Sequence, residues 1–390
     1  MARGRGGFIG QDGLNAPDSP TGVSASAGDA QADVSFTAPT DVGGSAITGF
    51  RAQSNTGVGA SGTSSPITVT GLSNGTSYTF NVWAINAFGY SAPSDASGSV
   101  TPAQPTLAMM FQGGGNTNIA KFNMDSAGTA TDFGDTPSNV SLPCALCNAT
   151  RLVQAGGDTD INDINYWTVS SGGTGQDFGD SATNGYGRGA VNTNTRGVFM
   201  GGYTNQVINV MDYITIASTG NGTDFGDLTV GKYRGAGAIN STTRGVHSAG
   251  YLQGFTNTNV IDYITIASTG NATDFGNTLS TIRALAGCSN STRGVLGGGI
   301  ISSATNEISY ITIASTGNAT DFGDLSTNAS YLGAAANSTN AFFYSNSFGG
   351  GNGIQYVTIS STGNSSTWAD YYSSQTSAQY GTSAGHGGLS

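Results

Sequence analysis

Hydrophobic and polar residues alternate in short runs along the first hundred residues of the chain. The clearest run is "GLSNGTSYTFNVWAINAFGYSAPS", in which Tyr78, Phe80, Val82 and Ala84 occupy every second position. A period of two predicts a β-strand with one buried face. Similar runs, "ADVSFTAP" and "SAITGFRA", precede it and are separated by turn-forming residues. Residues 17–102 are therefore predicted to form a β-sandwich.

A longer periodicity organises the rest of the chain. The segment "YITIASTGNATDFG" occurs at Tyr263–Gly276 and again, unchanged, at Tyr310–Gly323. Its phenylalanine recurs in an Asp-Phe-Gly of each earlier repeat, and a tryptophan replaces it in the last, at Phe133, Phe178, Phe225, Phe275, Phe322 and Trp368. The spacing indicates six repeats of about 47 residues, each with four short strands. In "YITI" both faces carry bulky side chains, which predicts a strand packed on both sides.

Composition favours an all-β fold. Only 9% of the residues are charged and 62 are glycine; Glu307 is the one glutamate, and Lys121 and Lys232 are the two lysines. Residues that favour exposed helices are therefore scarce. We expect an N-terminal arm at 1–16, a sandwich at 17–102, a linker at 103–106 and the repeats at 107–390.

The charge balance excludes several partners. A net charge of -11 and a pI near 4.3 disfavour binding to nucleic acid, which needs clustered Lys and Arg. No apolar run approaches the roughly 20 residues that span a bilayer, so we expect no membrane insertion. The N-terminus lacks the apolar segment of a secretory signal. Cys144 and Cys147 are expected to be small apolar residues of a strand.

Two resemblances extend the fold prediction. Leu72 followed by Tyr78 resembles the leucine and tyrosine-corner pattern of fibronectin type III domains, although Phe36 stands where that family usually has a tryptophan. The family implies a spacer or binding platform. The length, four strands and paired glycines of the later repeats resemble blades of kelch-type β-propellers. This resemblance implies a six-bladed propeller, closed when the C-terminal "SAQYGTSAGHGG" supplies the strand that the first repeat lacks.

The motifs give little support for catalysis. Asp-Phe-Gly recurs five times without the nucleotide loop of a kinase, so we interpret its Phe as core. Equivalent arginines in four repeats are expected to contact aspartates or carbonyls, at Arg151, Arg196, Arg244 and Arg293. Asp158, Asp160 and Asp163 could hold Ca²⁺, but a solvated loop is favoured. His247 and His386 stand far apart, so we predict no catalytic residue, metal or cofactor.

The loops between the second and third strands vary between repeats and are the predicted binding surface. Their aromatic and amide side chains suit neutral sugars, although sequence drift would also explain the variation. The candidate residues are Tyr203, Asn205, Gln206, Tyr251, Gln253 and Phe255. A second recurrent set would form either a cationic ring or salt bridges to neighbouring repeats, namely Arg188, Lys232, Arg234 and Arg283.

The combination of modules resembles bacteriophage virion structural proteins, and "MARGRGGFIG" resembles the N-termini of such proteins from marine phages. The resemblance implies a non-enzymatic appendage in the virion, a tail fibre or a capsid decoration protein. Its expected partners are other virion proteins (capsid, tail or fibre), further copies of itself and a host-surface glycan. The candidate anchoring residues are Arg3, Arg5, Phe8 and Ile9. Two alternatives stay open: an adhesin or lectin outside a virion, and a sialidase-like glycoside hydrolase that depends on Glu307.

Overall fold

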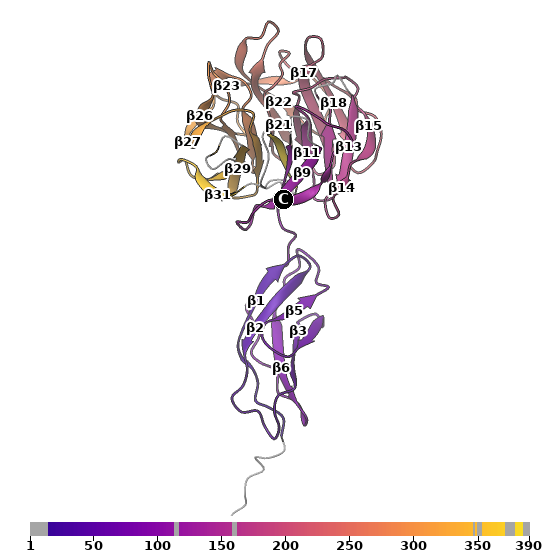
Figure 1. The fold of residues 1–390 in the computed structure, drawn as a ribbon, viewed down its shortest axis with the longest axis vertical. Helices are drawn as coiled ribbons and strands as arrows, with labels where there is room; N and C mark the ends of the chain where they lie inside the picture. The colour runs from indigo at the N-terminus through magenta and orange to yellow at the C-terminus, as the bar shows by residue number, and fades with distance from the viewer. Residues whose placement is uncertain are drawn as a thin grey trace, which may run out of the picture. The chain divides into compact units, whose positions relative to one another are not determined.

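A computed structural model describes residues 15–112, 117–157, 162–345, 348, 353–370 and 379–384. It divides the chain into two compact units, Met1–Pro105 and Thr106–Ser390 (Figure 1). Throughout the described residues, every regular element is a β-strand, as the composition predicts. The candidate anchoring residues Arg3, Arg5, Phe8 and Ile9 lie outside the described residues.

The first unit contains two antiparallel sheets. One sheet contains β1 (Thr21–Gly28), β2 (Gln31–Thr37) and β5 (Ile67–Thr70). The other contains β4 (Gly59–Gly62), β3 (Gly49–Ser54), β6 (Phe80–Asn86) and β7 (Gly89–Tyr90), in that spatial order. Alternate residues of β6 are buried, as the period of two predicts. Phe36 and Phe50, with ring centroids 4.8 Å apart, belong to the core between the sheets.

Tyr78 fixes the approach to β6. Its hydroxyl accepts a hydrogen bond from the backbone N–H of Ser73 at 3.0 Å, while its ring and Leu72 are buried in the core. The bond spans a short loop, so the Tyr side chain holds the corner between the two sheets. This is the contact that the spacing of Leu72 and Tyr78 predicts.

The described residues of the second unit form six sheets, which are numbered in chain order. All strand pairs within a repeat are antiparallel. The first sheet contains β8 (Leu107–Gln112), β9 (Asn118–Asn123) and β10 (Thr131–Asp135). The second contains β11 (Cys144–Cys147), β12 (Arg151–Ala155), β13 (Asp163–Thr168) and β15 (Gln176–Asp180). The third contains β16 (Gly189–Asn192), β17 (Arg196–Tyr203), β18 (Val207–Thr215) and β19 (Thr223–Asp227).

The remaining sheets follow the same plan. The fourth contains β20 (Ala236–Asn240), β21 (Arg244–Tyr251), β22 (Asn257–Thr265) and β23 (Thr273–Ile282). The fifth contains β24 (Ala286–Ser289), β25 (Arg293–Gly297), β26 (Thr305–Thr312) and β27 (Thr320–Ala329). The sixth contains β28 (Gly333–Ala336), β29 (Asn340–Ser345), β30 (Gly353–Thr358) and β31 (Ser366–Asp370). Two additional strands join the first sheet, β14 (Gly173–Thr174) beside β10 and β32 (Gln379–Ala384) beside β8.

Each sheet packs on the next through its own apolar cluster. Five clusters join successive sheets from the first to the sixth, and another joins the sixth to the first through Phe122, Phe342 and Tyr344. The first strands are small-residue segments that lie beside one another in the order β11, β16, β20, β24, β28 and β32, and β32 also lies beside β11. The expected pairing of the C-terminal segment with the first repeat is present, since β32, the last described strand, pairs with β8.

Candidate functional site

The Asp-Phe-Gly motif joins neighbouring sheets. Its Phe is buried, and its Gly has a φ of 136–151° that disfavours other residues. In the fourth sheet the carbonyl of Phe275 accepts a hydrogen bond from Gly317 N–H at 2.7 Å, and Ala319 N–H donates to the carbonyl of Asn277 at 2.8 Å. Asn277 N–H donates to Asn318 Oδ1 at 3.0 Å. The Thr-Gly-Asn segment of one sheet thus docks on the Asp-Phe-Gly of the sheet before it, and we call this contact the clasp.

The clasp recurs along the repeats. The same Gly-to-Phe bond, at 2.7 or 2.8 Å, links Gly220 to Phe178, Gly270 to Phe225 and Gly363 to Phe322. Between the first and second sheets, the parallel pairing of β14 with β10 takes its place. The sequence predicts the Phe as core, which is confirmed. It also predicts the turn at Thr-Gly-Asn, but the hydrogen-bonded turn lies just before these residues, where Ser268 N–H donates to the carbonyl of Thr265 at 3.2 Å, and Thr-Gly-Asn continues the same loop. The clasp itself was not predicted, because it joins two different segments of neighbouring repeats, and the sequence of one repeat does not show which segments come into contact.

The four equivalent arginines reinforce the same junctions. Arg244 stacks over Tyr263 of its own sheet, 4.3 Å from the ring centroid, and donates to the carbonyl of Ile313 in the next sheet at 2.7 Å. The others repeat this geometry with bonds of 2.7–3.1 Å, namely Arg151 to Ile216, Arg196 to Ile266 and Arg293 to Ile359. The expectation of carbonyl partners is confirmed.

The second set of cations does not form a ring. Arg188 is buried and paired with Asp212, and Lys232 is buried 2.9 Å from Asp262. Each pair lies within one sheet, so the expectation of salt bridges to neighbouring repeats is wrong as well. The partner carboxylate comes from the third strand of the same sheet, where it neutralises the buried charge. Burial lowers the pKa of Lys232, and the adjacent Asp262 opposes that shift.

An aromatic cluster forms where the variable loops of the third and fourth sheets meet. Tyr203, Tyr251 and Phe255, all predicted, lie together with Tyr186 and Tyr233. Neighbouring ring centroids are 5.0–6.4 Å apart. Tyr186 and Tyr233 were missed, although the recurrence of a tyrosine just before the small-residue strand could have revealed them. We call these five residues the aromatic cluster.

Phe255 is the exposed member of the aromatic cluster. Its side chain is 60% exposed, and its backbone is left-handed with a φ of 62° at the tip of a turn closed by a bond from Phe255 N–H to the carbonyl of Leu252. A left-handed backbone and an exposed ring are each unfavourable for phenylalanine, and such strain is concentrated at functional sites. Gln253 ties the two loops together, since its Oε1 accepts a 2.9 Å bond from Val207 N–H. Asn205 and Gln206 are exposed beside it.

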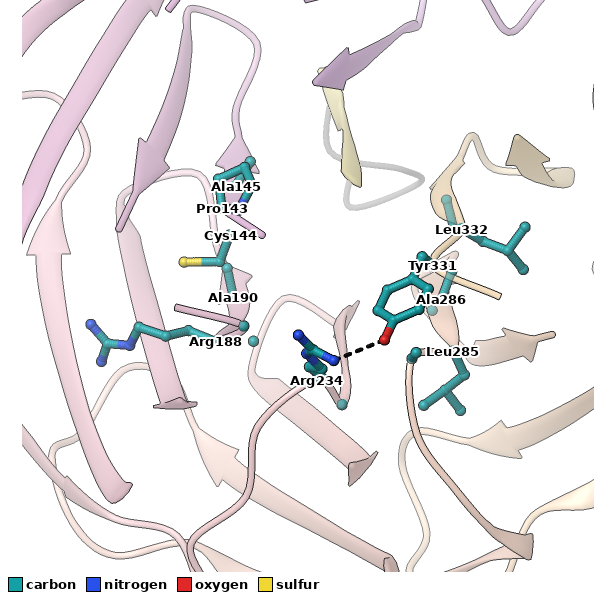
Figure 2. A pocket seen from close by; sticks show the side chains of 16 residues that line it. Pro143, Cys144, Ala145, Arg188, Ala190, Arg234, Leu285, Ala286, Tyr331 and Leu332 are labelled. Carbon is teal, nitrogen blue, oxygen red and sulfur yellow. Dashed lines mark hydrogen bonds between the residues drawn. The ribbon is translucent and has the colours of Figure 1, made fainter. Parts of the chain in front are cut away.

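A pocket opens between the starts of the first strands, lined by residues of five sheets. Two residues before the first strands of the second to sixth sheets, the backbone is left-handed. From the third sheet onward, the N–H of this residue donates to the carbonyl of the equivalent residue in the preceding sheet at 2.7–3.0 Å. This chain of bonds runs through Leu142, Gly187, Arg234, Ala284 and Tyr331. Figure 2 shows Arg234 and Tyr331 pointing toward each other and joined by a hydrogen bond, whereas the side chain of Arg188 points away from them. The guanidinium of Arg234 donates to the Tyr331 hydroxyl at 2.8 Å.

Other candidates are spread over the unit. Cys144 and Cys147 are buried, unpaired residues of β11, as expected, and burial raises the pKa of the Cys144 thiol to about 12. Asp163 begins β13, while Asp158, Asp160 and His386 lie outside the described residues. The described part of the chain contains no cluster of three His, Cys, Asp or Glu that could hold a metal. Glu307 accepts a 3.2 Å bond from the Ser280 hydroxyl, and burial raises the pKa of its carboxyl.

No helix among the described residues is long and apolar enough to cross a membrane. A comparison with curated proteins finds no relative of the chain. A comparison with protein families matches residues 18–99 to the fibronectin type III domain. The match covers the two-sheet unit and its tyrosine corner, so the resemblance drawn from Leu72 and Tyr78 is confirmed. The chain therefore begins its described part with a fibronectin type III domain.

Proposed function

We propose that the chain is a non-enzymatic adhesion protein of a bacteriophage particle, a tail fibre or capsid decoration protein, that binds host-surface glycan through the aromatic cluster. The observation that carries the adhesion proposal is Phe255, an exposed ring on a strained turn with Tyr203 and Tyr251 behind it. Sugar rings present C–H faces that pack on aromatic rings, while amides such as those of Asn205 and Gln206 hydrogen-bond hydroxyl groups.

The scaffold in this proposal is a six-bladed, kelch-like β-propeller. Three observations support it: a three-strand repeat followed by five four-strand repeats, an apolar cluster between the sixth sheet and the first, and first strands that follow one another back to β11. Pairing of β32 with β8 supports closure by the C-terminal strand. A propeller places all loops between second and third strands on one face, where the aromatic cluster would meet a ligand.

The virion location rests on the sequence resemblance and on the N-terminal candidates Arg3, Arg5, Phe8 and Ile9. Mass spectrometry of purified particles tests it, and absence of the protein from them would refute it. Deletion of residues 1–15 is expected to release the protein from particles while leaving its glycan binding unchanged. An adhesin that functions outside a virion would give the opposite result, glycan binding without particle association.

Binding to immobilised neutral glycans tests the adhesion proposal. Phe255→Ala removes the exposed ring and is expected to weaken binding about tenfold or more, since stacked aromatic anchors each contribute about 1–3 kcal/mol. Phe88→Ala is the matched control, because Phe88 is also exposed (46%) but lies in the fibronectin type III domain. Equal binding by both variants would refute the assignment. Turnover of a sialoside, abolished by Glu307→Gln, would instead establish the hydrolase alternative.

A further inference from the structure

The pocket between the first strands has the dimensions and lining of a small-molecule site. Its volume is about 70 Å³, and its walls are mostly glycine, alanine and leucine. A single water needs about 10–15 Å³ on this measure, so there is room for an ion of four or five heavy atoms. Because most of the lining side chains are small and apolar, the polar groups of the pocket wall come from the few longer side chains. Of these, Arg234 and Tyr331 face the pocket (Figure 2).

Arg234 differs from Arg188, the other cation in the pocket lining, in having no carboxylate partner. In the described part of the chain the ion pairs are Arg188 with Asp212 and Lys232 with Asp262, so the charge of Arg234 is not balanced by an acidic side chain within 4 Å. Its Nε is buried without a hydrogen-bond partner. A guanidinium that lines a pocket without a carboxylate partner is available to an anion from outside the protein.

Donor groups converge on the same space. Arg234 has five N–H donors, of which one is used by the Tyr331 hydroxyl, and that hydroxyl retains its own proton for a further bond. The backbone at both residues is left-handed and hydrogen-bonded to neighbouring sheets, so their positions are fixed before any ligand arrives. A preorganised guanidinium with a neighbouring hydroxyl matches the oxygen atoms of an anion.

We infer that this pocket binds a small oxyanion, a carboxylate or phosphate group, through Arg234 and Tyr331. The aromatic cluster adjoins the site, because the guanidinium of Arg234 lies 5.5 Å from the ring centroid of Tyr233. Two sources share this chemistry: a free inorganic anion, and the acidic group of a sugar whose ring lies on the aromatic cluster. Only the second source depends on the proposed adhesion function.

Calorimetric titration of the full chain with inorganic phosphate, glucuronate and glucose tests the inference. Binding of phosphate or glucuronate is expected, with affinity at least tenfold lower in Arg234→Gln and clearly reduced in Tyr331→Phe. Arg51→Gln makes the same charge change in the fibronectin type III domain and is expected to bind like the unmodified protein. Tyr331→Phe removes one hydroxyl and keeps the ring, so it remains informative if Arg234→Gln fails to fold.

The outcomes separate the possible sources. Binding of both acids identifies a general oxyanion site, and binding of glucuronate alone identifies an acidic sugar. Either result supports the inference if the Arg234 and Tyr331 variants lose binding of the acid. No binding of either acid, or binding that survives both substitutions, overturns it. Phe255→Ala is expected to leave phosphate binding unchanged, so failure of the adhesion proposal can be recognised separately.

Discussion

Substitution of one clasp glycine tests whether the repeated Asp-Phe-Gly segment holds the sheets together. Gly276 has a φ of 144°, and a Cβ at this position would lie 2.4 Å from the carbonyl oxygen of Gly317 and 2.6 Å from its carbonyl carbon. Both obstructing atoms belong to the backbone, so relief requires movement of the turn in the fifth sheet. That movement breaks the 2.7 Å bond from Gly317 N–H to the carbonyl of Phe275.

The expected cost follows from these two effects. A positive φ at a residue with a Cβ costs about 1–2 kcal/mol, and a lost backbone hydrogen bond adds about 1 kcal/mol. Gly276→Ala should therefore lower the free energy of unfolding by about 3 kcal/mol, which for a unit of this size lowers Tm by about 5–10 °C. Chemical denaturation of the full chain, followed by near-ultraviolet circular dichroism, would measure the loss.

The other side of the same clasp provides a matched control. A Cβ at Gly317 meets no atom within 4 Å, and the backbone there is outside the left-handed region. Gly317→Ala is therefore expected to change the free energy of unfolding by less than about 0.5 kcal/mol. Equal destabilisation by the two substitutions, or none by Gly276→Ala, would refute the role of the close approach.

Three further predictions concern buried polar groups. Lys232→Met leaves the carboxylate of Asp262 buried without its cation and should cost about 3–5 kcal/mol of unfolding free energy, most of which Asp262→Asn restores in the double variant. Burial lowers the pKa of His247 well below its usual 6.5. Below pH 6.5 the unfolded chain therefore binds a proton that the folded chain does not, and the free energy of unfolding falls as the pH is lowered. The decline should be steeper than in His247→Leu by about 1.4 kcal/mol per pH unit in urea titrations. Tyr78→Phe removes the bond to Ser73 N–H and should destabilise the fibronectin type III domain by about 1 kcal/mol in thermal unfolding, with no change expected in the second unit.

Patterns within one segment were enough to predict much of the fold. The alternation around Phe80 gives the buried face of β6, and the recurrence of Phe275 and Phe322 gives the number of sheets and their buried rings. These predictions succeed because the period of a strand and the burial of a ring are local properties of the sequence. The pairing of β32 with β8 also follows, because a repeat without its first strand needs one from elsewhere.

Contacts between distant residues were harder to predict. Arg188 and Arg234 look alike in sequence, yet one is neutralised by Asp212 and the other faces a pocket. The two arginines differ in their position relative to the left-handed residue: Arg188 is the residue after the left-handed Gly187, whereas Arg234 is itself the left-handed residue. Only three of the five members of the aromatic cluster were predicted, for a related reason. Tyr233 precedes its strand instead of lying in a variable loop, and only the folded chain brings it to Phe255.

The clasp gives the series of sheets a direction and, among the described residues, is missing between the sixth sheet and the first. The first repeat keeps the Asp-Phe-Gly at Gly134 but has "SAGTA" in place of the Thr-Gly-Asn segment, whereas the last keeps the segment at Gly363 but has Ala369 in place of the motif's glycine. The first repeat thus keeps only the part that contacts the second sheet, and the last repeat keeps only the part that contacts the fifth sheet. The junction of the sixth sheet with the first depends instead on aromatic packing and on β32. Under heat or mechanical load the second unit should separate there first, and hydrogen exchange should be fastest in β32 and the strands beside it.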